Sequence, residues 1–181
     1  MNKFLILICI ALFASCKSPE ARKPISTKSG SFINASIERN KKLNAQEQAA
    51  IEKIMTQQNN KYIASKSGFW YYYNHKVEND SLKTPDFGDI INYNYNVKRL
   101  NGNIIYSKEE IKTQSYAMDK QELFTGLREG LKLLKTGETA TFLFPSQKAY
   151  GYYGDENRIP HNTPIICEVT VNSITTQNGL N

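Results

Sequence analysis

The pattern of apolar and polar positions changes near Ser67. After this residue, short runs rich in aromatic and β-branched side chains are separated by glycine, proline and asparagine, which is typical of β-strands joined by turns. The longest run covers residues 89–100, and along one of its faces the apolar positions alternate, at Ile91, Tyr93, Tyr95 and Val97. Further strands are expected at residues 68–73, 103–106, 139–144 and 165–174. The pattern therefore predicts an antiparallel sheet.

The connections between these runs have signals of their own. Asn101-Gly102 follows the longest run and predicts a type I′ hairpin turn, because both central positions of that turn need positive φ. Residues 145–164 are expected to form a long loop rich in tyrosine, glycine and proline. The sequence thus places one tight turn and one long loop among the strands.

One amphipathic helix is predicted among the strands. Asp119, followed by Glu122 three residues later, predicts its N-terminal cap, and Gly137 predicts its end. Leucines recur at helical spacing over residues 120–135, at positions 123, 127, 131 and 134. A sheet with one main amphipathic helix is an α+β fold, and the length suits a single domain of about 110 residues.

A second, short helix is predicted ahead of this domain, at residues 44–60. It follows residues 16–43, which are polar, contain two prolines and lack periodicity, and which therefore indicate a flexible tether. Asn44 and Glu47 resemble a capping box at the start of the helix. We expect its apolar residues to dock on the domain, although pairing with a second copy stays open; they are Ala50, Ile51, Ile54 and Met55.

The first residues of the chain indicate export. A short positive start precedes an unbroken apolar run at residues 4–13, which as a helix reaches only about 15 Å and is too short to span a membrane. Residues 1–15 are therefore predicted to be a signal peptide. They lead into Leu12-Phe13-Ala14-Ser15-Cys16, which resembles a lipobox, so Cys16 is the expected lipidation site. An ordinary signal peptide followed by a chance cysteine is the alternative. Lys17 favours the outer membrane and a protein that faces the periplasm.

The distribution of charge argues against a nucleic-acid partner. The formal net charge is +6, but residues 17–66 hold ten Lys or Arg and four Asp or Glu, whereas residues 67–181 hold twelve and thirteen. The basic excess therefore lies in the N-terminal arm, while a nucleic-acid-binding domain usually carries a basic face on its folded part. We interpret the arm as solvated, and specific binding to anionic lipid is the alternative.

The few cysteines and histidines limit the chemistry further. Cys9 leaves with the signal peptide and Cys16 carries the expected lipid, so Cys167 alone remains and no disulfide can form within the mature chain. His75 and His161 lack partners at metal-ligand spacing. We therefore expect neither a metal nor another cofactor.

Four short motifs of the domain occur in a distinctive order. They are PDFGD at 85–89, YNY at 93–95, ELFTGLREG at 122–130, and AYG, G and IPHN within 149–162. In this order and at these separations, the chain resembles FKBP-type peptidyl-prolyl cis-trans isomerases. The resemblance implies an FKBP-like antiparallel sheet wrapped on one main helix over residues 62–176. The lipobox and the length further resemble the gliding-motility-associated FKBP-like lipoproteins of Bacteroidetes.

The resemblance also implies a pocket that holds a proline ring. Its walls and floor would be formed by Tyr95, Leu123, Phe124 and Leu127. The Tyr150 hydroxyl and the Phe124 backbone N–H would each bind a substrate carbonyl, and Ile159 would contribute to the rim. For Tyr95, Leu123 and Leu127, a plain role in the hydrophobic core stays open.

The chain departs from the family pattern around this expected pocket. Ile105 and Tyr106 stand where the family usually has an aromatic residue followed by an aspartate. Cys167 replaces a phenylalanine of the pocket wall, Gln114 another common aromatic residue, and Leu127 a frequent tryptophan. The lost aspartate removes a hydrogen-bond partner, although Tyr106 still supplies a hydroxyl and a ring. We therefore expect slow catalysis and poor binding of macrolide inhibitors.

The favoured interpretation is an isomerase that assists the folding of exported envelope proteins, with proline-containing polypeptides as substrates and gliding-motility proteins among the candidate clients. Such catalysis needs no nucleophile, metal or proton acceptor, so the lack of those motifs is consistent with it. The alternative is a non-catalytic chaperone or binding module that holds envelope proteins in the same groove. In a third interpretation, the N-terminal arm and helix are the functional part.

Overall fold

The computed structural model describes residues 29–176. The expected signal peptide, the lipidation site Cys16 and the first part of the expected tether lie outside the described residues. By its contacts the chain divides into two compact units, residues 1–38 and residues 39–181. In the part of the chain that the structure describes, no helix is both long enough and apolar enough to cross a membrane.

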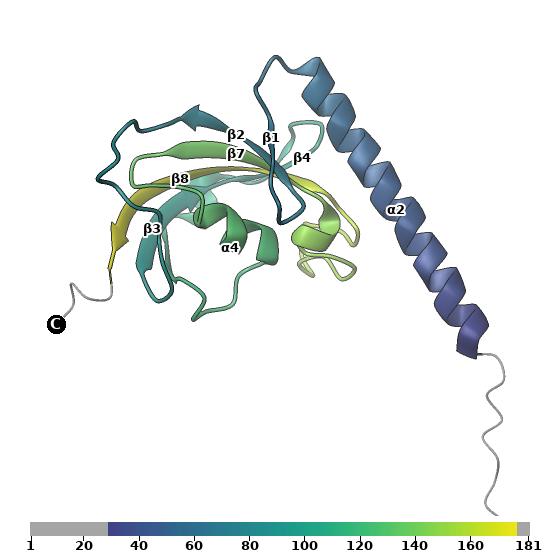
Figure 1. Ribbon diagram of the computed structural model, residues 1–181. Coiled ribbons are helices and arrows are strands. Elements are labelled where there is room, and N and C mark those ends of the chain that lie inside the picture. The colour runs from purple at the N-terminus through teal and green to yellow at the C-terminus, as the bar shows by residue number, and fades with distance from the viewer. Residues whose placement is uncertain (1–28, 177–181) are drawn as a thin grey trace, which may run out of the picture. The chain divides into compact units, whose positions relative to one another are not determined.

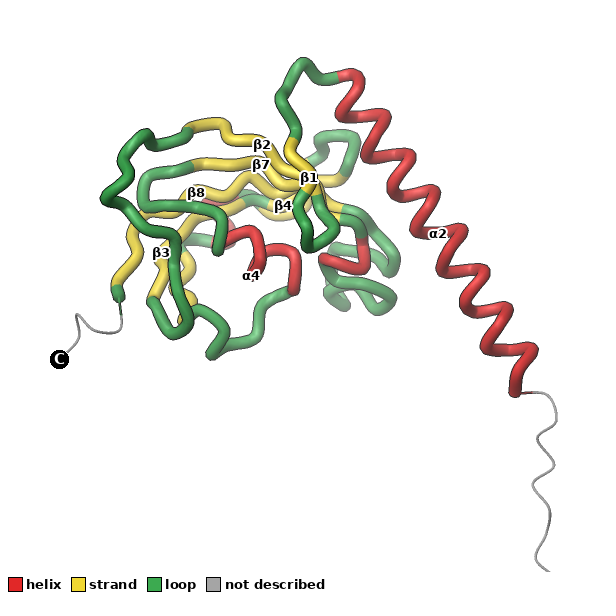
Figure 2. Tube along the Cα trace, viewed as in Figure 1, coloured by secondary structure: helices red, strands yellow, loops and turns green. Residues whose placement is uncertain are grey.

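The second unit contains an eight-stranded sheet, which confirms the predicted α+β class (Figures 1 and 2). The strand order is β1-β2-β7-β8-β3-β6, the hairpin β4–β5 pairs with β8, and every pairing is antiparallel. The strands are β1 (Ile63–Ala64), β2 (Trp70–His75), β3 (Ile90–Tyr95), β4 (Val97–Arg99), β5 (Ile104–Tyr106), β6 (Gln114–Ala117), β7 (Thr139–Phe144) and β8 (Ile165–Thr175). The helices are α2 (Ser29–Gln57), α3 (Lys108–Ile111), α4 (Thr125–Leu131) and the 3-10 turn η1 (Ser146–Lys148).

Helix α4 packs directly on strand β7 in the core of the sheet (Figure 1). The rings of Phe142 and Phe144 stack with their centroids 5.5 Å apart and face the helix. A Cβ atom on Gly126 would lie 2.5 Å from the Phe144 ring and 2.6 Å from the Lys148 carbonyl oxygen, and one on Gly130 would lie 3.0 Å from the Phe142 ring. The two glycines therefore allow the helix backbone to approach the sheet more closely than any side chain would permit.

The long predicted strand 89–100 is divided into β3 and β4 at Asn96. Both parts pair with β8, and Asn96 stays attached through its backbone N–H, which donates to the Glu168 carbonyl over 3.2 Å. Its side-chain oxygen accepts the Glu168 N–H over 3.1 Å. The Asn96 side chain thus takes the place of one backbone acceptor between the strands. The alternation of apolar residues does not indicate such a break in the strand.

The hairpin between β4 and β5 uses a different turn from the type I′ turn predicted. Gly102 has φ of +87°, but Asn101 is absent from the described residues with positive φ. The Gly102 N–H donates to the Arg99 carbonyl, and the pairing shifts register after Val97. This arrangement is a turn closed by a left-handed glycine bulge, which needs positive φ at a single position.

The predicted helix 120–135 was too long, because α4 covers only Thr125–Leu131. Asp119 has φ of +58° and does not cap the helix. Its carboxylate forms an ion pair with the Lys132 ammonium over 3.0 Å. Phe124 is extended, and single turns follow Leu131. The leucines keep helical spacing beyond the end of α4 because Leu127, Leu131 and Leu134 are all fully buried in one core. This spacing made the predicted helix too long.

Helix α2 covers Ser29–Gln57, whereas the predicted range was 44–60, so residues 29–43 of the expected tether are helical. Glu47 does not form a capping box with Asn44; it accepts hydrogen bonds from Ser146 in the second unit. Ile51 is fully buried. The predicted docking of this helix on the domain is therefore confirmed for the part that follows Arg39. Phe32, Ile33 and Ile37, which precede Arg39, are exposed.

We predict that Gly126→Ala destabilises the protein by about 1–3 kcal/mol, the usual cost of overpacking a core. Within an ordinary helix, the same substitution stabilises by about 0.5–1 kcal/mol, so the two expectations differ in sign. The measurement is the free energy of unfolding in urea. Gly102→Ala serves as a comparison that adds backbone strain alone, because Gly102 has φ of +87° but no atom within 4 Å of an added Cβ. A neutral or stabilising Gly126→Ala would contradict the close approach of α4 to the sheet.

Candidate functional site

The side chains expected in the pocket come from six separate segments of the domain. Tyr95 ends β3, Tyr106 ends β5, Cys167 lies in β8 and Leu127 in α4. The other four lie in loops or just before α4. The fold brings all eight into or against the hydrophobic core: Leu127, Ile159 and Cys167 are buried, and the partly buried ones are Tyr95, Tyr106, Leu123, Phe124 and Tyr150.

The centre of the site is the contact between Phe124 and Tyr150. Their ring centroids lie 5.1 Å apart at an interplanar angle of 41°. Phe124 also packs edge-on against Phe144 of β7, with centroids 5.6 Å apart, and the Tyr150 side chain lies close enough to Tyr95 to lower the pKa of the Tyr95 hydroxyl. The contact therefore joins the start of α4, the loop after η1 and the end of β3.

The hydroxyl groups of the site stay protonated over the physiological range. Burial raises the pKa of Tyr95 to about 12, with the Cys167 thiol adding to the rise and the hydrogen bond from Tyr150 opposing it. Burial also raises the pKa of Tyr150, with Tyr95, Cys167 and Asp155 adding to the rise. Complete burial raises the pKa of the Cys167 thiol, so this cysteine is a neutral apolar wall and no nucleophile.

A hollow open to solvent lies beside the Phe124–Tyr150 contact. Its volume is about 510 Å³, and it is lined by Gln121, Glu122, Leu123, Phe124, Arg128 and Tyr150. The lining combines apolar side chains with a phenolic hydroxyl and two residues of opposite charge. Such a surface can hold an apolar ring and offer a hydrogen bond to a nearby carbonyl.

Asp155 supplies a carboxylate to Tyr106, the residue that stands where the family pattern would place an aspartate. The Tyr106 hydroxyl donates to its Oδ2 atom. Its Oδ1 atom accepts the backbone N–H groups of Ile159 over 2.7 Å and Asn157 over 3.0 Å. Burial raises the pKa of Asp155, but the hydrogen bonds from Tyr106 and from these amides outweigh it and hold the pKa below its usual value. Asp155 is therefore an ionised acceptor that joins β5 to the long loop.

Arg158 covers the outer face of Tyr106. The centre of its guanidinium group lies 4.2 Å from the Tyr106 ring centroid, and one guanidinium nitrogen donates to the Ile105 carbonyl over 2.9 Å. The same group forms an ion pair with Glu110 of α3. The Tyr106 side chain is thus held between a carboxylate at its hydroxyl and a cation over its ring.

Sequence analysis missed Asp155 and Arg158, and it gave Glu47 a different role. An aspartate that precedes an asparagine in a glycine-rich loop is a signal for an Asx turn, and the Asn157 N–H does donate to Asp155. No local signal links Asp155 to Tyr106, because the two residues are brought together only by the fold. Gln114 does not replace the missing ring; its amide donates to the Ile111 carbonyl over 2.7 Å.

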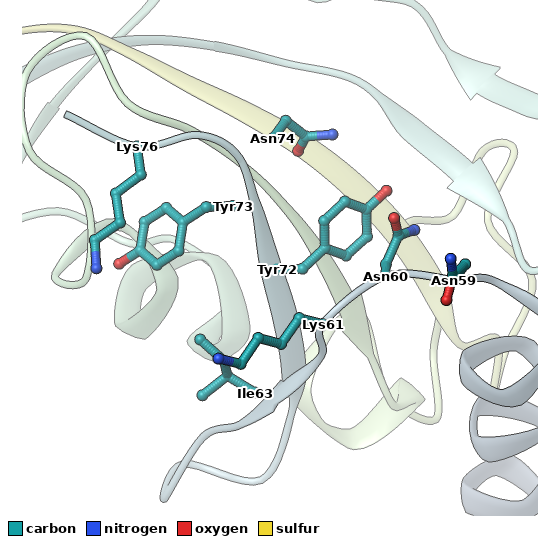
Figure 3. A pocket seen from close by; sticks show the side chains of 8 residues that line it. All are labelled: Asn59, Asn60, Lys61, Ile63, Tyr72, Tyr73, Asn74 and Lys76. Atoms are coloured by element: carbon teal, nitrogen blue, oxygen red, sulfur yellow. The ribbon is translucent and has the colours of Figure 1, made fainter.

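A second hollow, of about 630 Å³, lies between residues 59–63 and strand β2 (Figure 3). Tyr72 and Tyr73 extend to opposite sides of the strand, and the Lys76 ammonium lies 5.1 Å from the Tyr73 ring centroid. The lining is polar, with three asparagines and two lysines among its residues. It contains none of the side chains expected in the pocket, so we take the surface around Tyr150 as the candidate site.

Comparison with known proteins identifies a family for this arrangement. The sequence matches the family of FKBP-type peptidyl-prolyl cis-trans isomerases over residues 82–172, which is half of the chain and includes every expected pocket residue. A peptidyl-prolyl cis-trans isomerase from Pseudomonas syringae pv. tomato has 18% identity and a TM-score of 0.61, over 75% of this chain and 96% of that chain. FkpA from Escherichia coli has 21% identity and a TM-score of 0.59, over 97% of this chain and 82% of that chain. Both solved structures share the fold.

We predict that two partly buried tyrosines, Tyr95 of the site and Tyr73 of β2, make the protein lose stability above pH 10. In the unfolded chain, tyrosine ionises near pH 10, whereas the pKa values of folded Tyr73 and Tyr95 are about 12. The raised pKa values stabilise the protonated folded state, and this contribution to the free energy of unfolding is complete below pH 10. It is lost as the pH rises towards 12, because the unfolded state then releases its protons first. Urea unfolding at pH 9, 10 and 11 measures this loss. Tyr95→Phe should reduce the pH dependence, while Tyr153→Phe, at an exposed position, should leave it unchanged. Equal pH dependence in both variants would contradict the assignment.

Proposed function

The chain belongs to the FKBP-type peptidyl-prolyl cis-trans isomerase family, and from this premise we propose that it is a slow isomerase that assists the folding of exported envelope proteins. The observation that carries the proposal is the Phe124–Tyr150 contact beside Tyr95, where an apolar surface meets protonated hydroxyls. The proposed substrates are proline-containing exported polypeptides. Proteins of a gliding-motility machinery are one candidate class among them.

The proposed chemistry needs only shape and hydrogen bonds. Rotation about a peptide bond is opposed by about 18–20 kcal/mol, and uncatalysed exchange before proline takes tens to hundreds of seconds. A surface that binds the twisted amide more tightly than the planar one lowers this barrier. The twisted amide has less charge separation than the planar one, so apolar Phe124 and Leu127 favour it. In this proposal the Tyr150 hydroxyl and the Phe124 N–H each donate to a substrate carbonyl.

The side chains around the proposed pocket support slow turnover. Leu127 and Cys167 offer less apolar surface than the rings they replace, and a smaller wall holds the proline ring less tightly. The Tyr106–Asp155 pair supports retained activity, because it supplies a fixed hydroxyl and carboxylate at the rim. These two effects act in opposite directions, and we propose that the result is a working but weak catalyst.

A second candidate function is a non-catalytic chaperone or binding module. The observation that favours it is the pair Tyr152 and Tyr153, which directly follows Gly151 and is 72% and 80% exposed. Their rings meet edge to face with centroids 5.3 Å apart, and this forms an exposed aromatic surface next to Tyr150. Such a surface suits weak binding of unfolded chains, independent of any isomerisation.

We further propose that the protein is anchored by lipid at Cys16 and faces the periplasm at the outer membrane. The support is the sequence alone, in which a short apolar run ends in Leu12-Phe13-Ala14-Ser15-Cys16. An anchored isomerase would meet its substrates as they leave the export machinery.

We predict that purified residues 17–181 accelerate the isomerisation of short Xaa-Pro-Phe peptides in a protease-coupled assay. Tyr150→Phe should lower kcat/KM by about tenfold, because one hydrogen bond to the substrate is lost. Phe124→Ala should lower it by more than about tenfold, because it removes the apolar ring of the pocket. Tyr153→Phe is the matched control, since it removes a hydroxyl from an exposed tyrosine of the same loop.

The outcomes separate the two candidate functions. Acceleration that falls in Tyr150→Phe and stays unchanged in Tyr153→Phe supports the isomerase. A folded protein that accelerates no peptide across several Xaa residues would exclude it. If that protein still binds an unfolded, proline-containing chain, and Tyr152→Ala weakens the binding, the binding module becomes the better account.

We also predict that Cys16 carries fatty acid. Cells of a Gram-negative host expressing the full chain and fed an alkyne fatty acid should incorporate the label into the protein, and Cys16→Ser should abolish the incorporation. Cys9→Ser is the matched control, because Cys9 lies in the expected signal peptide and should leave the label unchanged. Label retained in Cys16→Ser would contradict the anchor.

A further inference from the structure

We propose that Glu47, a residue of the N-terminal helix α2, is a positioning residue of the isomerase site that acts on Tyr150 through Ser146. The proposal rests on the proposed isomerase function for its effect on catalysis. Its structural part, that Glu47 fixes the loop around Tyr150, stands apart from catalysis and is tested separately below.

Glu47 is a buried carboxylate whose hydrogen bonds are directed at a single residue. Only 5% of it is exposed, although the residues on either side of it in α2 are exposed. Its Oε2 atom accepts the Ser146 N–H over 2.8 Å, and its Oε1 atom accepts the Ser146 hydroxyl over 2.6 Å. Ile51, one helical turn later, is fully buried and lies on the same face. Helix α2 therefore meets the domain through a charged side chain at Glu47 and an apolar one at Ile51, and Leu43 lines a hollow beside Ser146 and Gly151.

Ser146 transmits this contact to the residues on both sides of Tyr150. Its carbonyl oxygen accepts the Ala149 N–H over 3.0 Å and the Gly151 N–H over 2.8 Å. The donors of Ser146 are thus bound to Glu47, while its acceptor holds the two amides that flank the tyrosine. A shift of Ser146 would move both amides, and Tyr150 would move with them.

Within the loop, Ser146 is the residue whose hydrogen bonds connect the backbone around Tyr150 to helix α2. The Gly151 carbonyl accepts the Asn162 N–H over 2.8 Å, which closes the loop on itself. The Tyr150 ring packs on Phe124 with the ring centroids 5.1 Å apart. These contacts place the hydroxyl only if the backbone under it is fixed. Misplacement of a substrate-binding group by about 1 Å can cost about a hundredfold in rate.

A carboxyl group at position 47 suits this task better than an amide or a hydroxyl. A carboxylate can accept from both donors of Ser146 at once, and hydrogen bonds to a charged acceptor are about twice as strong as neutral ones. Burial of a charge is costly unless it is hydrogen-bonded. A Glu47–Ser146 pair that is only partly formed is therefore strongly unfavourable. The complete pair favours one docked position for the helix residues around Glu47.

The test is a double-mutant cycle in the purified protein. Glu47→Ala should lower kcat/KM for an Xaa-Pro-Phe peptide by about tenfold, and Glu47→Gln, which keeps one acceptor, by less. In the Tyr150→Phe background, Glu47→Ala should change kcat/KM by less than about twofold, because the hydroxyl that Glu47 positions is already gone. Glu52→Ala is the matched control, since Glu52 is an exposed glutamate of the same helix that bonds to Gln48.

A second measurement follows the loop itself and needs no activity. In Glu47→Ala, the amides of Ala149 and Gly151 should exchange with deuterium at least about tenfold faster, because their acceptor is no longer fixed. The amides of β7 and β8 should keep their protection, and Glu52→Ala should leave all of these amides unchanged. A uniform rise in exchange over the whole domain would instead show global destabilisation and would overturn the proposal.

The two measurements distinguish the possible failures. If the wild-type protein is inactive but Glu47→Ala selectively frees the amides of Ala149 and Gly151, the proposed isomerase function fails and the structural part of the inference stands. If the wild-type protein is active and Glu47→Ala lowers kcat/KM by the same factor with and without the Tyr150 hydroxyl, Glu47 does not act through Tyr150. Unchanged exchange at both amides would overturn the inference in either case.

Discussion

Helix α4 lies against strand β7 with no side chain between them at Gly126, and the rest of the site depends on this close approach. The position of a Cβ atom on Gly126 is already filled by the Phe144 ring and the Lys148 carbonyl oxygen. The helix, the sheet and the turn η1 therefore meet at one point. Phe124 lies two residues before that glycine and Tyr150 two residues after Lys148, so the same contact brings their rings within 5.1 Å. The close packing of the backbone at Gly126 therefore sets the positions of the Phe124 and Tyr150 side chains in the candidate site.

Most of the strands were predictable because their signal is local. Runs of β-branched and aromatic residues between turn residues placed β7 correctly and β8 to within one residue, whereas the short strands β1 and β6 were not predicted. Helix bounds were less predictable, since the leucines at 123–134 keep helical spacing although only Thr125–Leu131 is helical. Burial in a common core selects leucine in either backbone conformation. The break at Asn96 depends on a hydrogen bond to Glu168, which no local pattern contains.

The acceptor at Tyr106 illustrates how a site can keep a chemical group while the sequence position of that group changes. Loss of the aspartate from strand β5 predicted a missing hydrogen-bond partner, yet the Tyr106 hydroxyl donates to Asp155, which lies in the long loop. Electrostatic interaction depends on where a carboxylate is in space, and not on which segment carries it. A prediction made position by position cannot detect this exchange. The fold reveals it because Asp155 also binds the amides of Asn157 and Ile159.

These contacts explain how an irregular loop can serve chemistry that has no reacting group. The loop at 145–164 is held at its start by Glu47, in its middle by Asp155 and across its width by the bond between Gly151 and Asn162. A surface that only favours one amide geometry acts through position alone, so its selectivity is limited by how firmly its hydrogen-bond donors are held. Two carboxylates from distant parts of the chain, buried Glu47 and partly buried Asp155, both accept backbone amides of this loop, as that requirement leads us to expect.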